Sequence, residues 1–300
     1  MKILNFGSLN LDYVYQVPHF VQPGETLHAA RQQVYCGGKG LNQSIALARA
    51  GAQVYHAGCV GEGGQRLVAE LEKNGVDTGC ISAIPGPQGN AVIQVDDSGE
   101  NCILLFGGSN RSIIPDQIDR VLAGFDSGDW LVLQNEINSL ADILKKAAAK
   151  GMKIALNPSP FDEAAQKLDY NLVDWLLVNE VEAQQITGQT QPQRVWEALH
   201  AAYPKLQLVL TQGSRGADCF TPHQHIHQDA FPVQAVDTTA AGDTFTGYFL
   251  DSLLRGHSPA QCLRRASCAS AIAVTRSGAA DSIPSADEVE RRLASLPAPD

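Results

Sequence analysis

Two aspartates six residues apart, Asp237 and Asp243, enclose a run of small residues in the stretch Asp237-Thr-Thr-Ala-Ala-Gly-Asp243. Apolar residues recur at helical spacing after Asp243, which predicts a tight loop leading into a helix that begins near Asp243. A helix N-terminus presents unpaired N–H groups and the positive end of the helix dipole, so it attracts anions. A carboxylate beside such an anion site suits a group-transfer enzyme, because one part holds charge while the other orients a hydroxyl. Taken alone, the stretch is explained equally well by an ordinary Asp N-cap.

Polar residues also follow the first predicted strand, residues 3–6. Asn10 and Asp12 stand there, and ligands of α/β proteins collect at the carboxyl ends of parallel strands. An amide and a carboxylate together suit the vicinal hydroxyls of a sugar, which need several directional donors and acceptors. A simple turn after the strand explains the pair as well. Lys39 stands near the start of a predicted helix, where the dipole disfavours a cation, so its position suggests a functional reason.

The segment Asn179-Glu180-Val181-Glu182 has the pattern of a helix start with acids in its first turn. The functional alternative puts Asn179 and Glu182 near phosphate groups, where they order the waters that a bound Mg²⁺ ion keeps. Two further polar residues stand at predicted strand ends or helix starts, Asn42 and Glu136.

Several common motifs are absent from the chain. It contains no GxxxxGK[ST] and no GxGxxG after the first strand, which argues against a P-loop and a dinucleotide site. GxSxG and HExxH are also absent. His223, His225 and His227 alternate, but no fourth ligand is evident, so a surface hairpin is favoured over a metal site.

The order of predicted elements indicates an α/β fold. Strands alternate with helices through most of the chain, which predicts a three-layer, doubly wound, mostly parallel sheet in a single domain over residues 1–300. Two segments at about 13–35 and 89–107 depart from this alternation and have the pattern of hairpins. We expect them to form a small β-sheet that stands over the site as a lid.

Composition limits the class of protein. The chain has 300 residues, 44% of them hydrophobic, and a net charge of −10, which argues against a nucleic-acid partner. No run approaches the roughly 18 apolar residues of a membrane span, and the first residues indicate a strand, not a signal peptide. The seven cysteines are scattered without a CxxC pair. They are expected to be free thiols in a reducing cytoplasm.

Together these residues resemble the ribokinase-like carbohydrate kinases of the phosphofructokinase B type. The stretch 237–243 is joined by six other segments in order: Gly7-Ser-Leu-Asn-Leu-Asp12, Pro23-Gly-Glu-Thr26, Gly37-Gly-Lys-Gly-Leu-Asn42, Asn157-Pro-Ser-Pro160, Thr211-Gln-Gly-Ser-Arg-Gly216 and Ala271-Ile-Ala-Val-Thr-Arg-Ser-Gly-Ala279. The resemblance thus covers nearly the whole chain. It departs from the family at the loosely matching lid segment 106–110 and at Ser267, where related kinases often carry a larger polar residue.

The resemblance implies an ATP-dependent kinase that phosphorylates the primary hydroxyl of a pentose, D-ribose first among them, to the 5-phosphate. Other small sugars or nucleosides, such as fructose, deoxyribose or adenosine-like compounds, remain open, as does a sugar-binding protein without catalysis. Asp243 would be the base, and the backbone at Ala240, Ala241, Gly242 and Asp243 would form the anion hole. The implied sugar-binding residues are Asn10, Asp12, Gly38, Lys39, Asn42, Glu136 and Asp243.

The remaining implications concern cofactors and assembly. The resemblance gives an ATP site at Asn179, Glu182, Thr211, Gly213, Ser214, Gly216, Gly242 and Ser267, with Asn179 and Glu182 also serving Mg²⁺. It gives a monovalent-cation (K⁺) site at Asp237, Thr239, Ala273, Arg276, Gly278 and Ser282, largely through carbonyl oxygens. It also implies a homodimer formed through the lid, with no membrane or nucleic-acid partner.

Overall fold

The structure, a computed structural model, describes residues 1–296. Its centre is a nine-stranded sheet whose neighbouring strands are parallel, except that β12 pairs antiparallel with β11 and with β13. From edge to edge the strands are β13 (Gln224–Gln228), β12 (Ala217–Thr221), β11 (Gln207–Thr211), β10 (Trp175–Asn179), β9 (Lys153–Asn157), β8 (Trp130–Gln134), β1 (Ile3–Phe6), β4 (Val54–Glu62) and β5 (Asp77–Pro87). The predicted mostly parallel sheet is confirmed. Central strands such as β1 and β8 are buried along their whole length because both faces are covered.

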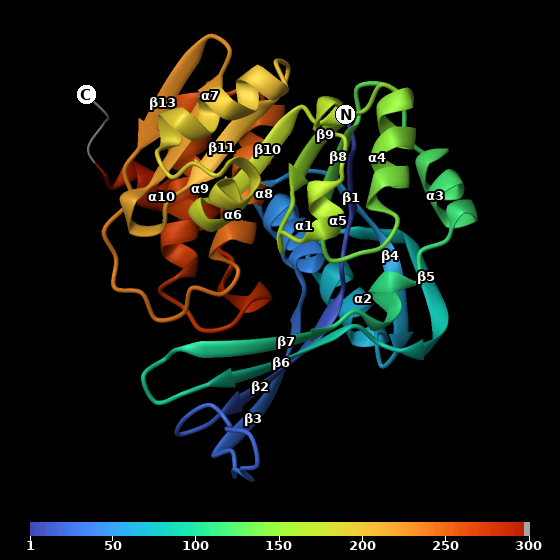
Figure 1. Ribbon diagram of the computed structural model, residues 1–300, viewed down its shortest axis with the longest axis vertical. Coiled ribbons are helices and arrows are strands. Elements are labelled where there is room, and N and C mark those ends of the chain that lie inside the picture. Colours follow the sequence, from blue (N-terminus) through green and yellow to red (C-terminus); the bar gives the residue numbers. More distant parts are fainter. Residues whose placement is uncertain (297–300) are drawn as a thin grey trace.

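Helices cover both faces of this sheet, so the main body has three layers (Figure 1). Consecutive strand residues alternate between the two cores: Ile3 packs into one and Leu4 into the other. The first core includes helices α1 (Lys39–Ala50), α2 (Gln65–Lys73), α8 (Ala241–Leu254), α9 (Pro259–Ala273) and α10 (Ala286–Ala294). The second includes α3 (Pro115–Leu122), α4 (Leu140–Ala149), α6 (Glu180–Thr187) and α7 (Pro192–Ala202), and a short α5 (Glu163–Gln166) follows β9.

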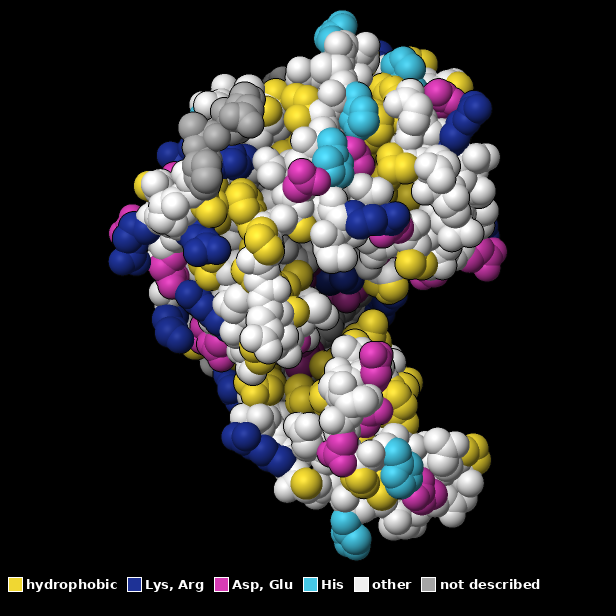
Figure 2. All heavy atoms as spheres, turned by 90° about the vertical axis from the view of Figure 1, so that its left-hand side faces the viewer, with side chains coloured by type: hydrophobic (Ala, Val, Ile, Leu, Met, Phe, Trp, Pro, Cys, Tyr) yellow, Lys and Arg dark blue, Asp and Glu magenta, His cyan; other side chains and the backbone are white. Residues whose placement is uncertain are grey.

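A separate four-stranded sheet projects from the main body (Figure 1), and we call it the lid. Its strand order is β3 (Arg31–Gly37), β2 (Asn10–Gln16), β6 (Asn90–Val95) and β7 (Asn101–Phe106). The two predicted hairpins, β2–β3 and β6–β7, are antiparallel, and β2 joins them by pairing parallel with β6. Figure 2 shows the hollow between the lid and the main body.

Two elements differ from the expectations. Strand β2 begins at Asn10, so Asn10 and Asp12 lie within a lid strand and not in a turn. Strand β5 was not expected, because Gly79, Pro85 and Gly86 interrupt its sequence pattern. It is an edge strand with a register shift against β4, which is where such interruptions are tolerated.

All seven cysteines are free thiols, as expected. Within residues 1–296, none of the helices has both the length and the apolar character that crossing a membrane requires.

Candidate active site

The loop that ends with Ala240 turns sharply into helix α8. Ala240 is the N-cap residue and has a left-handed backbone with φ 58°, an uncommon conformation for a residue with a side chain. Its side chain makes no capping hydrogen bond, and the helix begins at Ala241. Asp243 is therefore the third helical residue and not the N-cap, so the ordinary capping explanation is wrong. Backbone strain of this kind persists where the surrounding structure requires it, often at functional sites.

The first turn of α8 presents free backbone amides to a cavity. The amide of Ala241 donates to the carbonyl of Thr238 at 3.2 Å. The amides of Gly242 and Asp243 have no hydrogen-bond partner among residues 1–296. A Cβ atom at Gly242 would meet nothing within 4 Å. Of the four amides expected at residues 240–243, only that of Ala241 therefore has a hydrogen-bond partner in the described part of the chain, and open space lies in front of Gly242.

The Asp243 carboxylate is buried and held by two amide side chains of α1. Asn42 Nδ2 donates to Oδ2 at 3.0 Å, and Gln43 Nε2 donates to Oδ1 at 2.9 Å. The two helices approach closely at Gly247, where a Cβ would lie 2.4 Å from the Cβ of Ala46. Gln43 was not among the predicted site residues, although its position beside Asn42 in the glycine-rich segment was available as a signal.

Lys39, Glu136 and Asp12 lie close enough to Asp243 to influence one another's charges. The backbone amide of Lys39 donates to Glu136 Oε2 at 3.0 Å, and the hydroxyl of Ser8 donates to the same oxygen. Burial lowers the pKa of Lys39, but the carboxylates around it, led by Asp243 and Glu136, outweigh burial and raise that pKa overall. Lys39 is therefore a protonated amine at neutral pH, suited to a phosphate or to a sugar oxygen.

Two residues predicted to bind the sugar, Asn42 and Asn10, each have a side-chain polar atom without a hydrogen-bond partner among the described residues. Asn42 Oδ1 is buried and unpaired among the described residues. Asn10 Oδ1 accepts from Asn110 Nδ2 at 2.7 Å, which turns the Asn10 amide so that its Nδ2 is the group left for a ligand. Asn110 is itself fixed by Leu9, whose amide donates to Asn110 Oδ1 at 2.9 Å. Asn110 is a supporting residue that the sequence argument missed.

The carboxyl group of Asp12 is almost fully buried on β2. Burial, with smaller contributions from the nearby charges of Glu136 and Asp243, raises the pKa of Asp12 from 3.8 to about 7. No hydrogen bond to its side chain occurs within residues 1–296. Gly38 adjoins this region with a φ of +93°, a conformation that favours glycine.

We expect Asp12→Asn to stabilise the protein in a pH-dependent way. Because the pKa of Asp12 is raised on folding, the folded state binds the extra proton between about pH 4 and pH 7, and stability falls as pH rises through that window. The variant should raise the free energy of unfolding by roughly 1–3 kcal/mol at pH 8, and by much less at pH 4.5. Urea denaturation at the two pH values measures this. The exposed Asp116→Asn serves as control, and equal stability of wild type and Asp12→Asn at pH 8 would refute the expectation.

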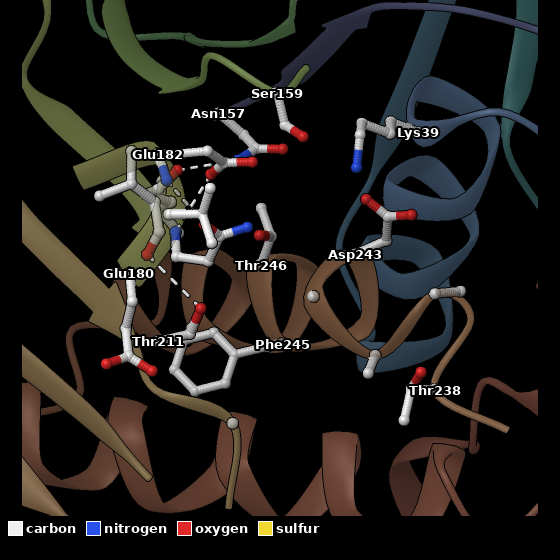
Figure 3. Close-up of a pocket in the computed structure, with 18 residues that line it drawn as sticks. Lys39, Asn157, Ser159, Glu180, Glu182, Thr211, Thr238, Asp243, Phe245 and Thr246 are labelled. Carbon is white, nitrogen blue, oxygen red and sulfur yellow. Dashed lines mark hydrogen bonds between the residues drawn. The ribbon is translucent and has the colours of Figure 1, made fainter. Parts of the chain in front are cut away.

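Asn179 and Glu182 form a reciprocal capping box at the start of α6. Glu182 N donates to Asn179 Oδ1 at 2.9 Å, and Asn179 N donates to Glu182 Oε2 at 3.1 Å. Both residues also line a cavity of about 400 Å³ together with Lys39 and Asp243. Figure 3 shows Lys39 and Asp243 on one side of this cavity, with Asn157 and Glu182 opposite. Capping leaves Asn179 Nδ2 and Glu182 Oε1 for a ligand, so the capping role does not exclude the predicted role in binding phosphates.

A second cavity of about 490 Å³ adjoins the first, because Thr211, Gly213 and Gly242 line both. Ser214, Gly216 and Ser267, the other residues predicted for ATP, line this second cavity. Its wall is largely apolar, with contributions from Phe231, Pro232 and Val233. An apolar slot that opens onto free helix amides suits a molecule with a flat ring at one end and phosphates at the other.

The six residues predicted to bind a monovalent cation lie in two segments, 237–239 and 273–282. Asp237 links these segments through its side chain. Its Oδ1 accepts from the amide of Thr239, and its Oδ2 accepts from the amide of Gly278, each at 2.9 Å. Arg276 is paired with Glu288 at 2.6 Å, and Ser282 Oγ donates to the carbonyl of Ala279 at 2.8 Å. Ala273 and Ser282 are buried. The carbonyl oxygen of Ala273 accepts from the amide of Arg276 at 3.0 Å.

The three histidines lie at the far edge of the sheet. His223 is in the turn before β13, while His225 and His227 are on the strand and both contact Asp218 Oδ1, at 2.7 and 3.0 Å. No cluster of three or more His, Cys, Asp or Glu residues with metal-binding geometry occurs in the described part of the chain. The predicted surface hairpin, β12–β13, is confirmed.

Comparison with known proteins gives consistent matches. The family model described as "pfkB family carbohydrate kinase" matches residues 1–286. The ribokinase of Haemophilus influenzae is 36% identical, over 94% of this chain and 95% of that protein. The deoxyribokinase of Salmonella typhi is 30% identical, over 98% of this chain and 99% of that protein. The structure of Arabidopsis thaliana ribokinase complexed with ribose and ATP superposes with a TM-score of 0.84 at 28% identity, covering 97% of this chain and 98% of that one.

Proposed function

This chain belongs to the pfkB family of carbohydrate kinases and is an ATP-dependent sugar kinase, and from this premise we propose that its substrate is D-ribose, converted to D-ribose 5-phosphate. The observation that carries the proposal is the Asp243 carboxylate beside the free amides of Gly242 and Asp243. A base and an anion site are joined at one helix turn. The name ribokinase, carried by the relative at 36% identity, supports the choice of sugar.

In the proposed reaction, Asp243 accepts the proton of the sugar's primary hydroxyl as its oxygen attacks the terminal phosphorus of ATP. The bond from that phosphorus to the bridging oxygen breaks, and ADP leaves with the released electron pair. The amides of Gly242 and Asp243 donate to the transferring phosphoryl group, and Lys39 adds a positive charge. Asn10, Asp12, Asn42 and Glu136 would hold the remaining hydroxyls.

Magnesium would be held near Glu182, whose Oε1 is left free by the capping box, while Asn179 Nδ2 would donate to a phosphate oxygen. When bound, it would neutralise phosphate charge. The adenine ring would occupy the apolar cavity beside Phe231, with Ser267 at its edge.

Initial rates of ADP release over a panel of sugars test the choice of substrate. D-Ribose should give the highest kcat/KM with ATP, Mg²⁺ and K⁺ present. The deoxyribokinase relative makes 2-deoxyribose the main rival, and a much higher kcat/KM for that sugar would reassign the enzyme. Fructose and adenosine complete the panel, and binding of ribose without turnover would reject a kinase at this site.

A monovalent cation at the loop joined by Asp237 would stiffen the approach to the anion site. Exchange of K⁺ for tetramethylammonium should therefore lower kcat severalfold, since the larger ion cannot fit among backbone carbonyls. Asp237→Asn should weaken the response to K⁺, because Asp237 ties the two loops together. Equal rates in both salts at matched ionic strength would argue against this site.

A homodimer through the lid is the proposed assembly. Strand β7 is an edge strand with four consecutive exposed apolar residues, Ile103 to Phe106, and Leu104 is 70% exposed. Sedimentation equilibrium should give twice the monomer mass, and Leu104→Lys should shift it toward the monomer. A wild-type protein that sediments as a monomer at micromolar concentration would reject the assembly.

A further inference from the structure

Three fully buried amide side chains form a hydrogen-bonded chain behind Asp243, and the proposed mechanism does not use them. They are Gln43 on α1, Gln134 at the end of β8 and Asn5 on β1, each with an exposed fraction of 0%. Gln134 Nε2 donates to Gln43 Oε1 at 2.7 Å and to Asn5 Oδ1 at 2.9 Å. Gln43 Nε2 then donates to Asp243 Oδ1 at 2.9 Å. The chain thus ends on the carboxylate proposed as the base.

A backbone carbonyl at the Asn5 end fixes which atom donates and which accepts in each hydrogen bond of this amide chain. Asn5 Nδ2 donates to the carbonyl oxygen of Gly40 at 2.8 Å, and a carbonyl oxygen can only accept. Asn5 must therefore turn Oδ1 toward Gln134, so Gln134 must donate. Gln43 must accept from Gln134 with Oε1, which leaves its Nε2 for Asp243.

A second carbonyl fixes the same orientation from another strand. Asn157 Nδ2 donates to the carbonyl oxygen of Leu177 at 2.8 Å, which turns Asn157 Oδ1 toward Gln43 Nε2 at 3.4 Å. The opposite orientation of Gln43 would bring Oε1 against two acceptor oxygens, those of Asn157 and Asp243. Because Gln43 is fully buried, such acceptor–acceptor contacts are costly.

Gln134 has a side-chain oxygen without a protein partner. Both of its N–H groups are used in the chain, while Oε1 is buried without a partner among residues 1–296. That oxygen lies against Gly7, where a Cβ would come within 2.4 Å of it. An unpaired buried polar atom costs about 1–3 kcal/mol.

We propose that Gln43 is a positioning residue for the base, and that Gln134 and Asn5 hold its N–H group toward Asp243 so that the carboxylate stays aimed at the substrate hydroxyl. This inference rests on the proposed role of Asp243. A hydrogen bond donated to an ionised carboxylate favours the ionised form in general, so loss of the donor should show in the pH dependence of turnover. Lys39, Asp12 and Glu136 are the charged groups near Asp243, and none of them is substituted in the variants below.

The test is the pH dependence of kcat in Gln43→Met, which keeps the side-chain length but removes the N–H donor. We expect kcat at neutral pH to fall about tenfold, with the acid limb of the profile moved up by about one pH unit. KM for the sugar should stay within about twofold, because Asn10, Asp12 and Asn42 are intact. Gln43→Glu should move the acid limb further, because it sets a second carboxyl group against Asp243.

Gln117→Met is the matched control. Gln117 is also a buried glutamine, and its Nε2 donates to the carbonyl of Gly58 at 2.9 Å, away from Asp243. This variant should lose stability without moving the acid limb. An acid limb and a kcat unchanged in Gln43→Met would overturn the proposal. If Gln43→Met does not fold, the pH dependence of kcat is measured in Gln134→Met instead. That substitution removes the donor that orients Gln43, so the same results are expected.

Asp243→Asn separates this inference from the proposed function. Loss of turnover in Asp243→Asn together with an unmoved acid limb in Gln43→Met would reject the amide chain and keep the base. Full activity of Asp243→Asn would reject the base, and the positioning role with it.

Discussion

Asp243→Ala is expected to lower kcat by about 10²–10⁴-fold, the range for a positioned acid–base group. The carboxylate is held by Asn42 and Gln43 at 3.0 and 2.9 Å and adjoins the free amides at the start of α8. No other carboxylate combines a fixed orientation with this anion site among the described residues. Steady-state kinetics with saturating ATP and sugar measure the loss.

Two companion variants make this result specific. Asp243→Asn keeps the shape and one acceptor oxygen but cannot take a proton at neutral pH, so it should lose as much activity as alanine. Asp116→Asn changes an exposed aspartate in the first turn of α3 and should leave kcat unchanged. A folded Asp243→Ala protein with wild-type turnover would remove Asp243 from the chemistry.

Gly242→Ala is expected to change stability and activity in opposite directions. Alanine is favoured over glycine in a helix by about 0.5–1 kcal/mol, and a Cβ at position 242 would touch nothing within 4 Å, so the variant should be slightly more stable. The open space that accepts the methyl group is the cavity proposed for the phosphates. The methyl group should therefore keep phosphate oxygens from the amides and lower kcat/KM for ATP by at least about tenfold.

Thermal unfolding measures the expected gain in stability, and ATP kinetics on the same preparation measure the expected loss of kcat/KM. Gly124→Ala is the matched control, since it is exposed, has a permitted backbone and meets its nearest atom, Val121 O, at an ordinary 3.5 Å. The kcat/KM for ATP of Gly124→Ala should equal that of the wild type. Wild-type kcat/KM for ATP in Gly242→Ala would mean that the phosphates bind elsewhere.

Local patterns in the sequence were sufficient where one physical cause dominates. The apolar strands at residues 3–6 and 130–134 are buried on both faces, and their hydrophobicity alone predicts them. The loop before α8 was found because small residues precede an acid and a helical repeat. Family resemblance then joined this loop to Lys39 and Asn42, which no local pattern relates to it.

What was missed depends on contacts between distant segments. Gln134 has no periodic or charge signal, and Gln43 is marked only by its place beside Asn42. The packing of α1 against β1 and β8 gives both residues their roles. Asn110 lies after the lid and contacts Asn10, 100 residues earlier. The Asp243 N-cap alternative was wrong because the left-handed Ala240 takes that position, and sequence alone does not reveal such a conformation at alanine.

The two bonds that hold Asp243 join residues 201 and 200 positions apart in the chain. During synthesis, α1 therefore emerges well before α8, and Asn42 and Gln43 lack their hydrogen-bond partner until α8 has been made. Contacts that close such long loops form late, because the entropy of closing the loop must be overcome first. Recovery of activity after dilution from denaturant should therefore lag behind recovery of helix signal, and turnover is a sensitive reporter of the final docking step.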